Sequence, residues 1–175
     1  LARILPDRFK KLLYAIDPLA RRIRGALNRA APSGLTEVAV AAGALKGARL
    51  QLDLQVEKDY WLGTYETDLQ QAVSELVQPG MIVYDVGANI GYISLLLART
   101  VGEQGRVISF EALPANLERL RHNLALNPFG ERVRVVAAAV SADSRPVRFL
   151  VGPSGAMGKA EGSAGRSLAY AETLE

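Results

Sequence analysis

Three short, nearly continuous apolar runs alternate with helical segments through the middle of the chain, and this order most constrains the fold. The runs occupy residues 81–86, 106–111 and 132–140. Between them, residues 89–102 and 114–127 carry the three- and four-residue apolar spacing of helices. Apolar runs of this length are typical of strands that are buried on both faces. The order predicts an α/β sandwich with a mostly parallel sheet and right-handed crossovers.

The sequence on either side divides the chain into three parts. Residues 1–34 are a basic amphipathic helical segment, residues 35–151 the core, and residues 152–175 a Gly-, Ser- and Ala-rich segment that we expect to be flexible. Within the core, residues 49–56 alternate apolar and polar side chains, which predicts a half-buried strand after a turn at Gly47. Since the chain starts with Leu rather than Met and no closing element follows, we expect a fragment of a longer protein.

A further helix is predicted just before the first apolar run. Thr67 or Asp68 would cap it, and Pro79-Gly80 would end it. Its apolar stripe is expected to face the core and consists of Leu69, Ala72, Val73, Leu76 and Val77. Residues 146–151 are a candidate fourth strand of the sheet.

Composition excludes several kinds of site. The chain has no Cys and a single His, His122, so disulfides, thiolate chemistry and a His-rich metal centre are excluded. We expect chemistry that needs no metal. The absence of Cys fits a reducing compartment, and a cytoplasmic location is predicted. No stretch approaches the roughly 20 apolar residues of a membrane-spanning helix.

Charge is unevenly spread along the chain, whose formal net charge is +3. Residues 1–30 hold eight Lys or Arg against two Asp, giving +6, and the remainder holds thirteen against sixteen acidic residues, giving −3. Because the basic excess belongs to the N-terminal segment, we predict no nucleic-acid partner for the core. Residues 7–29 have the pattern of a basic amphipathic helix, which either packs on the domain or touches an acidic membrane surface.

The turn "DVGANIGY" places an acid, two glycines and an asparagine where a strand meets a helix. Gly87 can adopt a positive φ and leaves the main chain open to a ligand, and Gly91 lets the following helix pack closely. Asp85 would repel a pyrophosphate, but it suits a cationic amine or sulfonium. The three-glycine fingerprint of dinucleotide sites is also absent. We therefore expect Asp85, Gly87, Ala88, Asn89 and Gly91 to bind a cofactor.

The second apolar run ends with Glu111, twenty residues after Gly91. An acid at this place accepts hydrogen bonds from ribose hydroxyls in nucleoside-binding folds. An acid before the turn and another on the next strand together indicate S-adenosylmethionine, whose amine would face the turn and whose ribose would face Glu111. An NAD(P)-dependent oxidoreductase stays open as an alternative, because Glu111 also suits an NAD ribose.

Four stretches resemble FkbM-type methyltransferases: "YWLGTYETDLQQAV", "VYDVGANIGYISLLLA", "GRVISFEALPANLERLRHNLALN" and "VVAAAVS". The resemblance covers roughly residues 50–150 and implies a class I Rossmann-like fold with S-adenosylmethionine as cofactor. It implies methyl transfer, usually to a hydroxyl of a sugar, polyketide or other small molecule. It also implies that Tyr65 and Glu66 close over the cofactor. By fold analogy, Ala139 and Ser141 would lie near the adenine.

The chain departs from the family's pattern in two places. Ala112 follows Phe110-Glu111 where the family usually has Pro, and nothing in residues 152–175 matches the acidic block expected further along. No general base is assigned, so the catalytic residues stay unknown. The resulting expectation is O-methylation of a hydroxyl on a small molecule or sugar. A non-catalytic cofactor-binding fragment is the remaining alternative.

Overall fold

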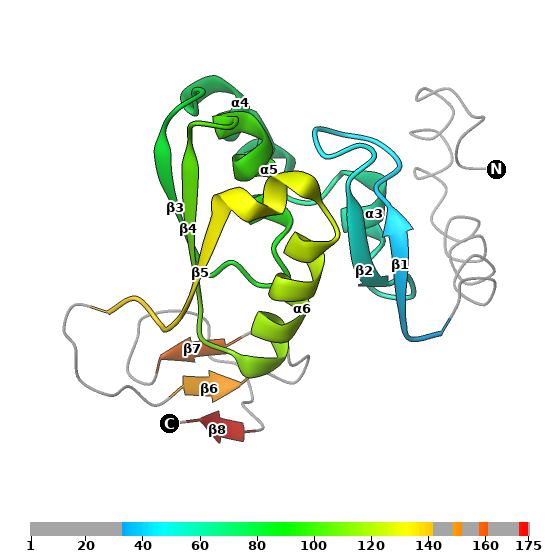
Figure 1. Cartoon of the computed structure of the whole chain (residues 1–175). Coiled ribbons are helices and arrows are strands. Elements are labelled where there is room, and N and C mark those ends of the chain that lie inside the picture. Colours follow the sequence, from blue (N-terminus) through cyan, green and yellow to red (C-terminus); the bar gives the residue numbers. More distant parts are fainter. Residues whose placement is uncertain (1–32, 142–148, 152–157, 161–171, 175) are drawn as a thin grey trace.

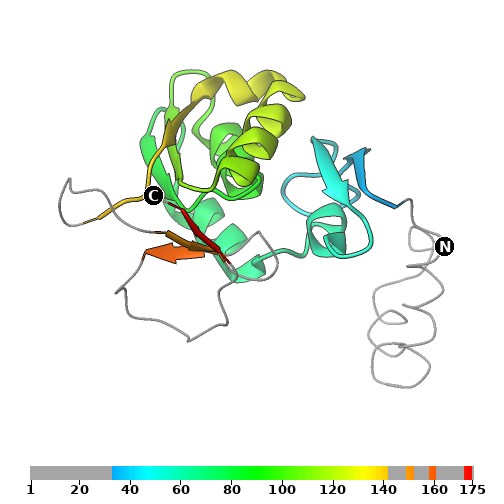
Figure 2. The same cartoon turned by 90° about the horizontal axis from the view of Figure 1, so that it is seen from below.

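The computed structural model describes residues 33–141, 149–151, 158–160 and 172–174 (Figure 1). Residues 7–29 and most of residues 152–175 lie outside this part of the chain, so the helical and membrane-surface predictions made for residues 7–29 stay predictions. The described core has three layers: a parallel sheet, helices on one face of it, and a small hairpin beyond the helices. Figures 1 and 2 show this order from two directions.

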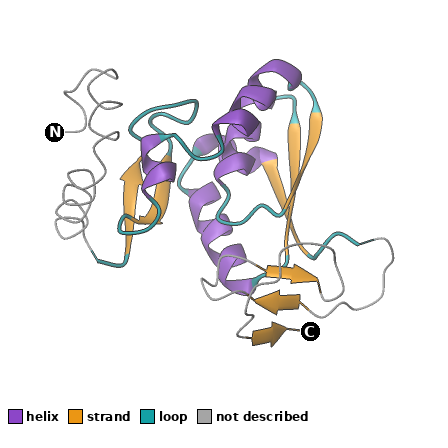
Figure 3. Ribbon diagram, turned by 180° about the vertical axis from the view of Figure 1, so that it is seen from behind, coloured by secondary structure: helices purple, strands orange, loops and turns teal. Residues whose placement is uncertain are grey.

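The parallel sheet has the strand order β3-β4-β5, with β3 at Ile82–Val86, β4 at Arg106–Glu111 and β5 at Val133–Ala137. α5 (Tyr92–Val101) connects β3 to β4, and α6 (Pro114–Ala125) with the 3-10 helix η1 (Pro128–Arg132) connects β4 to β5. Both connections cross the same face of the sheet (Figure 3). Leu95, Ala98 and Val101 of α5 are fully buried and form part of the core. The predicted α/β fold with a parallel sheet is confirmed.

The prediction that the first strand is buried on both faces is wrong for β3. Ile82, Tyr84 and Val86 are 64%, 65% and 63% exposed. β3 stands at the edge of the sheet, and among the described residues the helices cover only its other face. Tyr84 stacks on Phe110 of the neighbouring strand, with ring centroids 6.2 Å apart. An apolar run therefore marked a strand correctly, but it did not tell which faces are covered.

The hairpin pairs β1 (Leu35–Ala39) with β2 (Arg49–Asp53) in antiparallel register and is followed by the short helix α3 (Lys58–Leu62). Leu50 and Leu52 are fully buried, which confirms the period-two prediction for this strand. The strand ends at Asp53 rather than at Val56, because the Asp53 carboxylate accepts the Gln55 N–H and turns the chain. The predicted turn at Gly47 is present, with a φ of 84°.

α4 (Thr67–Leu76) occupies the place predicted for a helix before β3, and it packs on α5. The predicted cap is wrong. The N-cap is Glu66, in the left-handed conformation, and no side chain caps the first turn. Val73 is buried, but Leu69 is exposed at the mouth of a pocket and Leu76 is 71% exposed. The buried stripe is therefore narrower than predicted, and among the described helices and strands α4 packs mainly on α5.

Three short strands form a separate antiparallel sheet with the order β7-β6-β8. They are β6 (Phe149–Val151), β7 (Gly158–Ala160) and β8 (Glu172–Leu174). Figures 1 and 3 show this sheet beyond the end of the parallel sheet where β5 finishes. The candidate fourth strand is thus present in part, but it pairs with later residues instead of joining β5. Six residues of the segment predicted to be flexible are strand residues, because pairing with β6 satisfies their backbone groups.

Candidate functional site

The turn between β3 and α5 is built on three residues with a positive φ: Gly87 (85°), Asn89 (50°) and Gly91 (90°). The amides of Gly87 and Ala88 both donate to the carbonyl of Phe110 at 2.9 Å, which ties the turn to β4. A Cβ added to Gly87 would meet no protein atom within 4 Å. The Gly87 backbone therefore faces open space, as expected for a place where a ligand approaches the main chain.

Gly91 has a different role from Gly87. A Cβ at this position would come within 2.6 Å of Leu120 Cδ1 on α6. The glycine was expected to let α5 pack closely on the strand. The close contact is instead with α6, which lies across the start of α5.

Asp85 sits at the end of β3 with a buried side chain held by a chain of hydroxyls. Ser94 Oγ donates to Asp85 Oδ2 at 2.6 Å, and Ser109 Oγ donates to Ser94 Oγ at 2.9 Å. Burial raises the pKa of Asp85, and the nearby carboxylates of Glu111 and Glu66 raise it further, whereas the Ser94 hydrogen bond lowers it. The site thus holds a desolvated carboxylate that gains from a cationic partner.

Replacing Ser94 with alanine should make binding of a cationic ligand more sensitive to acid. The substitution removes the hydrogen bond that stabilises ionised Asp85, so the pKa of Asp85 rises and the carboxylate is protonated at a higher pH. The measurement is S-adenosylmethionine affinity from neutral to acidic pH, in which the affinity of Ser94→Ala should fall first. Ser74→Ala on the exposed side of α4 is the control. Overlapping pH profiles of wild type and Ser94→Ala would contradict the role given to Ser94.

Glu111 lies behind the turn rather than in the pocket. Its Oε2 accepts the Asn89 N–H at 2.8 Å, and its Oε1 accepts the amides of Ala112 and Leu113 at 3.0 and 2.8 Å. These bonds fix the left-handed Asn89 in place. Glu111 therefore shapes the turn through the backbone, a role that the strand-end position alone did not reveal. Its contact with a ribose stays a prediction.

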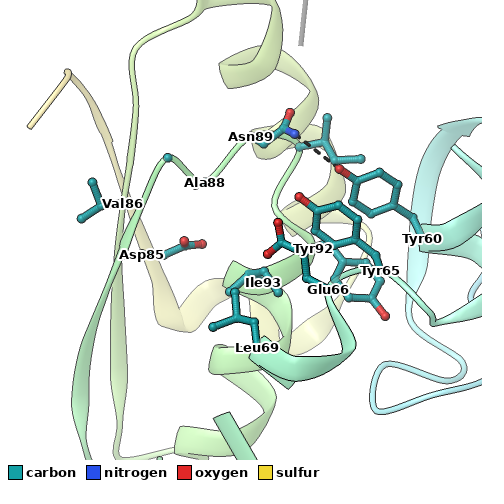
Figure 4. Close-up of a pocket in the computed structure, with 12 residues that line it drawn as sticks. Tyr60, Tyr65, Glu66, Leu69, Asp85, Val86, Ala88, Asn89, Tyr92 and Ile93 are labelled. Atoms are coloured by element: carbon teal, nitrogen blue, oxygen red, sulfur yellow. Dashed lines mark hydrogen bonds between the residues drawn. The ribbon is translucent and has the colours of Figure 1, made fainter. Parts of the chain in front are cut away.

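The turn forms one side of a pocket at the carboxyl ends of the strands (Figure 4). Within the part of the chain that the structure describes, the lining includes two carboxylates, Asp85 and Glu66, and no basic side chain. In Figure 4 both carboxylates lie on the same pocket, Asp85 from β3 and Glu66 from the start of α4. The remaining lining residues are Tyr60, Tyr65, Leu69, Val86, Gly87, Ala88, Asn89, Ile90, Tyr92 and Ile93. The pocket therefore has an acidic and aromatic lining, and a ligand in it can contact the main chain of the turn.

Three tyrosines form the second wall. Tyr60 stacks on Tyr65 with ring centroids 4.1 Å apart, and Tyr92 packs edge-on against both at 5.5 and 5.6 Å. Burial and the neighbouring Tyr65 raise the pKa of Tyr60 far above its ordinary range, so its phenol stays neutral. Aromatic faces attract cations electrostatically. Tyr60 and Tyr92 were missed in the sequence, where only the aromatic content of "YWLGTYE" and "IGY" could have signalled them.

Backbone and hydrogen-bonding anomalies gather at the same pocket. Glu66 and Asn89 are the two non-glycine residues with a positive φ in the part of the chain that the structure describes, and both line it. Two lining atoms, Asn89 Oδ1 and Tyr92 OH, are buried and have no hydrogen-bond partner among the described residues. Strained backbone and unpaired buried polar atoms cost free energy, and both are common at ligand sites.

The structure brings together most of the residues predicted to bind a cofactor. Tyr65, Glu66, Asp85, Gly87, Ala88 and Asn89 line the pocket, and Gly91 and Glu111 support the turn from behind. Ala139 and Ser141 follow β5, are exposed and do not line this pocket. Their place near an adenine stays a prediction.

Metal-binding clusters and membrane-spanning helices are both absent from the described residues. No group of three or more His, Cys, Asp or Glu there could hold a metal ion. No described helix is both long and apolar enough to cross a membrane.

The sequence matches the model of one known protein family. The sequence model of the methyltransferase FkbM domain matches residues 85–173, about half of the chain. The chain belongs to the FkbM methyltransferase family. The matched region starts at Asp85 and continues past residue 151, beyond the roughly 50–150 covered by the resemblance in the sequence. Whether residues 152–175 hold the acidic block of the family stays open.

Two curated relatives of this FkbM chain are similar over shorter stretches. The tRNA (adenine(58)-N(1))-methyltransferase TrmI of Thermus thermophilus is 42% identical over 62 residues, which are 35% of this chain and 24% of TrmI. The protein-L-isoaspartate O-methyltransferase of Aeropyrum pernix is 46% identical over 59 residues, 34% of this chain and 23% of the relative. The chain thus spans about a quarter of the length of the curated relatives that it matches.

Among solved structures, Pyrococcus horikoshii TYW2 in complex with MeSAdo superposes with a TM-score of 0.46 at 21% identity. The superposition covers 62% of this chain and 37% of TYW2.

Proposed function

We propose that this FkbM chain is an S-adenosylmethionine-dependent methyltransferase. The cofactor would lie in the pocket between the glycine turn, residues 87–91, and the tyrosine wall, formed by Tyr60, Tyr65 and Tyr92. The observation that carries the proposal is the charge of the lining: among the described residues it has two carboxylates and no basic side chain. S-Adenosylmethionine brings two cationic centres, an ammonium and a sulfonium. A buried carboxylate gains most from a cationic partner, because the attraction between opposite charges is stronger where water is excluded.

The residues present fit this cofactor. Asp85 would accept a hydrogen bond from the ammonium. Asn89 Oδ1, which has no partner in the described part of the chain, is a further acceptor. The open backbone at Gly87 leaves room for the methionine part, and the tyrosine faces suit a cation. When bound, S-adenosylmethionine supplies an electrophilic methyl group. The protein's contribution is to align an acceptor atom with that methyl group and to exclude water.

The charge of the pocket also separates this proposal from an NAD(P)-dependent oxidoreductase. A dinucleotide would place a pyrophosphate at the turn, next to buried Asp85 and close to Glu66. Like charges at short range in a partly desolvated site repel strongly. The alternative that the chain binds the cofactor without transferring a methyl group differs only in activity, so it is tested by assay.

For the acceptor, we propose a hydroxyl of a small molecule or sugar, as the family resemblance implies. The tRNA and protein methyltransferases among the relatives make tRNA and protein the competing acceptor classes. The absence of a nucleic-acid partner and the cytoplasmic location stay predictions. Transfer of labelled methyl from S-adenosylmethionine to sugar, small-molecule, tRNA and protein pools would distinguish these classes. Label in the tRNA or protein pool alone would overturn the small-molecule proposal.

Calorimetric titration of the folded chain with S-adenosylmethionine and, separately, with NAD tests the cofactor. Saturable binding of S-adenosylmethionine alone is expected. Binding of NAD alone would overturn the proposal. Binding of neither ligand would remove the cofactor assignment from this chain.

Replacing Gly87 with alanine should weaken S-adenosylmethionine binding by about tenfold or more, because the new methyl group occupies the open side of the turn. Gly80→Ala is a matched control. Gly80 also has a positive φ (88°), and an added Cβ there would meet no atom within 4 Å, but Gly80 does not line the pocket. Both variants should lose similar stability, and only Gly87→Ala should lose affinity. Equal affinities in the two variants would contradict a ligand at Gly87.

A further inference from the structure

α6 carries a polar face that is buried. Arg119 and Asn123 of α6 are spaced by four residues and lie on one side of the helix, and Asn127, just beyond the end of α6, continues this spacing. Asn123 is fully buried, Asn127 nearly so, and Arg119 is mostly shielded. Buried amides and guanidinium groups in a helix are costly unless each is paired. Their partners therefore show what this face does.

Part of the face closes the free edge of β2. The Asn127 side chain accepts the Arg49 N–H at 3.0 Å and donates to the Arg49 carbonyl at 2.8 Å. Asn123 Oδ1 accepts the Gln51 N–H at 2.7 Å, and Arg119 Nη2 donates to the Gln51 carbonyl at 3.0 Å. Arg49 and Gln51 are two residues apart, so their backbone groups point to the same edge of β2, and these side chains take the place of a neighbouring strand. These bonds fasten the hairpin to α6.

The same face also reaches both walls of the pocket. Asn123 Nδ2 donates to the carbonyl of Ile90, in the glycine turn, at 2.8 Å. Arg119 forms two charge-assisted bonds with Glu57, at 2.6 and 2.8 Å. Glu57 is the N-cap residue of α3, the helix that carries Tyr60. One helix face thus holds the turn through Asn123 and the tyrosine wall through Arg119.

We infer that Arg119 and Asn123 are positioning residues that set the separation of the two pocket walls and so control cofactor affinity without touching the cofactor. The inference deepens the proposed function, on which it rests for the identity of the ligand. Asn127 shares the hairpin contact but bonds to neither wall. Asn127 therefore holds only the hairpin, whereas Asn123 and Arg119 hold the hairpin and also a wall of the pocket.

The test compares Asn123→Ala with Asn127→Ala. Both substitutions leave backbone groups of β2 unpaired, so the two melting temperatures should fall by similar amounts. S-Adenosylmethionine affinity should fall about tenfold in Asn123→Ala, the equivalent of one lost buried hydrogen bond, and less than about twofold in Asn127→Ala. Losses of affinity that track the melting temperature in both variants would overturn the inference.

Arg119 is tested by its conservative variants. Arg119→Gln should weaken S-adenosylmethionine binding, and Arg119→Lys should restore part of it, because Lys keeps the charge opposite Glu57 but not the two-pronged geometry. Arg49→Gln, which breaks the exposed pair with Glu37, is the control and should leave affinity unchanged. Equal affinities in Arg119→Gln and wild type would contradict the role of Arg119.

Hydrogen exchange gives a readout that needs no ligand. In the unliganded chain, Asn123→Ala should speed amide exchange in both the glycine turn and the segment from Tyr60 to Glu66, whereas Asn127→Ala should leave the turn unchanged. If wild type failed to bind S-adenosylmethionine, the proposed function would fall, and this exchange pattern would still decide the positioning inference. Unchanged exchange in the turn of Asn123→Ala would overturn it.

Discussion

Replacing Asp85 with asparagine is expected to lower the affinity for S-adenosylmethionine by about 10- to 100-fold. Asparagine has nearly the same shape and can still accept the Ser94 hydroxyl, so the hydroxyl chain through Ser109 should survive. What is lost is the negative charge opposite a cationic ligand, and a hydrogen bond to a charged group contributes roughly 1.5–3 kcal/mol. Calorimetric titration measures the change directly.

Asp68→Asn is the matched control for this substitution. Asp68 is exposed in the first turn of α4, near the pocket mouth but outside its lining, and its removal changes the net charge by the same amount. It should change affinity little, because exposed charges are screened by solvent. Similar losses in both variants would show that only the general charge of this region matters. An unchanged affinity in Asp85→Asn would remove Asp85 from the binding site.

The Asp85→Asn variant should also be more stable than wild type when no ligand is bound. Burial raises the pKa of Asp85 in the folded chain, so the folded state binds the proton more tightly than the unfolded state. Stability contributed by this group is therefore lost as pH rises through the raised pKa. Asp85→Asn has no such titration. Its free energy of unfolding should exceed that of wild type at neutral pH, and the difference should shrink in acid.

Replacing Gly63 with alanine should destabilise the chain by about 3 kcal/mol or more. Gly63 ends α3 with a φ of 72°, and an added Cβ would overlap the carbonyl oxygen of Ala42 and crowd Gly43. The backbone cannot relieve this overlap by rotating a side chain, so the loop or the helix must move. Gly63 stands between Tyr60 and Tyr65, and the displacement should also disturb the tyrosine wall. Denaturant unfolding measures the loss.

Gly47→Ala separates steric overlap from backbone strain. Gly47 also has a positive φ (84°), but an added Cβ would meet no atom within 4 Å. It should therefore lose only the conformational cost of a left-handed alanine, about 1–2 kcal/mol. Equal losses in the two variants would mean that close packing at Gly63 contributes nothing to stability.

Most of the helices and strands of the core could be predicted from local sequence patterns. Apolar runs and helical periods located the parallel strands, α5 and α6, because burial on a covered face selects these residues whatever their neighbours are. The alternation in residues 49–56 located β2 for the same reason. Which face of the sheet the helices cover could not be predicted from such local patterns. Ile82 and Tyr84 are exposed because no described helix covers their face of the sheet, and sequence spacing carries no information on which face is covered.

The candidate site shows the same division. Asp85, Gly87 and Asn89 could be singled out in the sequence, since an acid and glycines at a strand–helix junction have few structural uses. Tyr60, Tyr92 and the polar face of α6 could not be, because the partners that give them a role are distant along the chain. Asn123 lies 33 residues from Ile90 and 72 from Gln51. Sequence by itself determined which residues can carry the chemistry. Only tertiary packing, which brings distant backbone groups within hydrogen-bonding reach, decided which residues hold the two walls of the pocket in place.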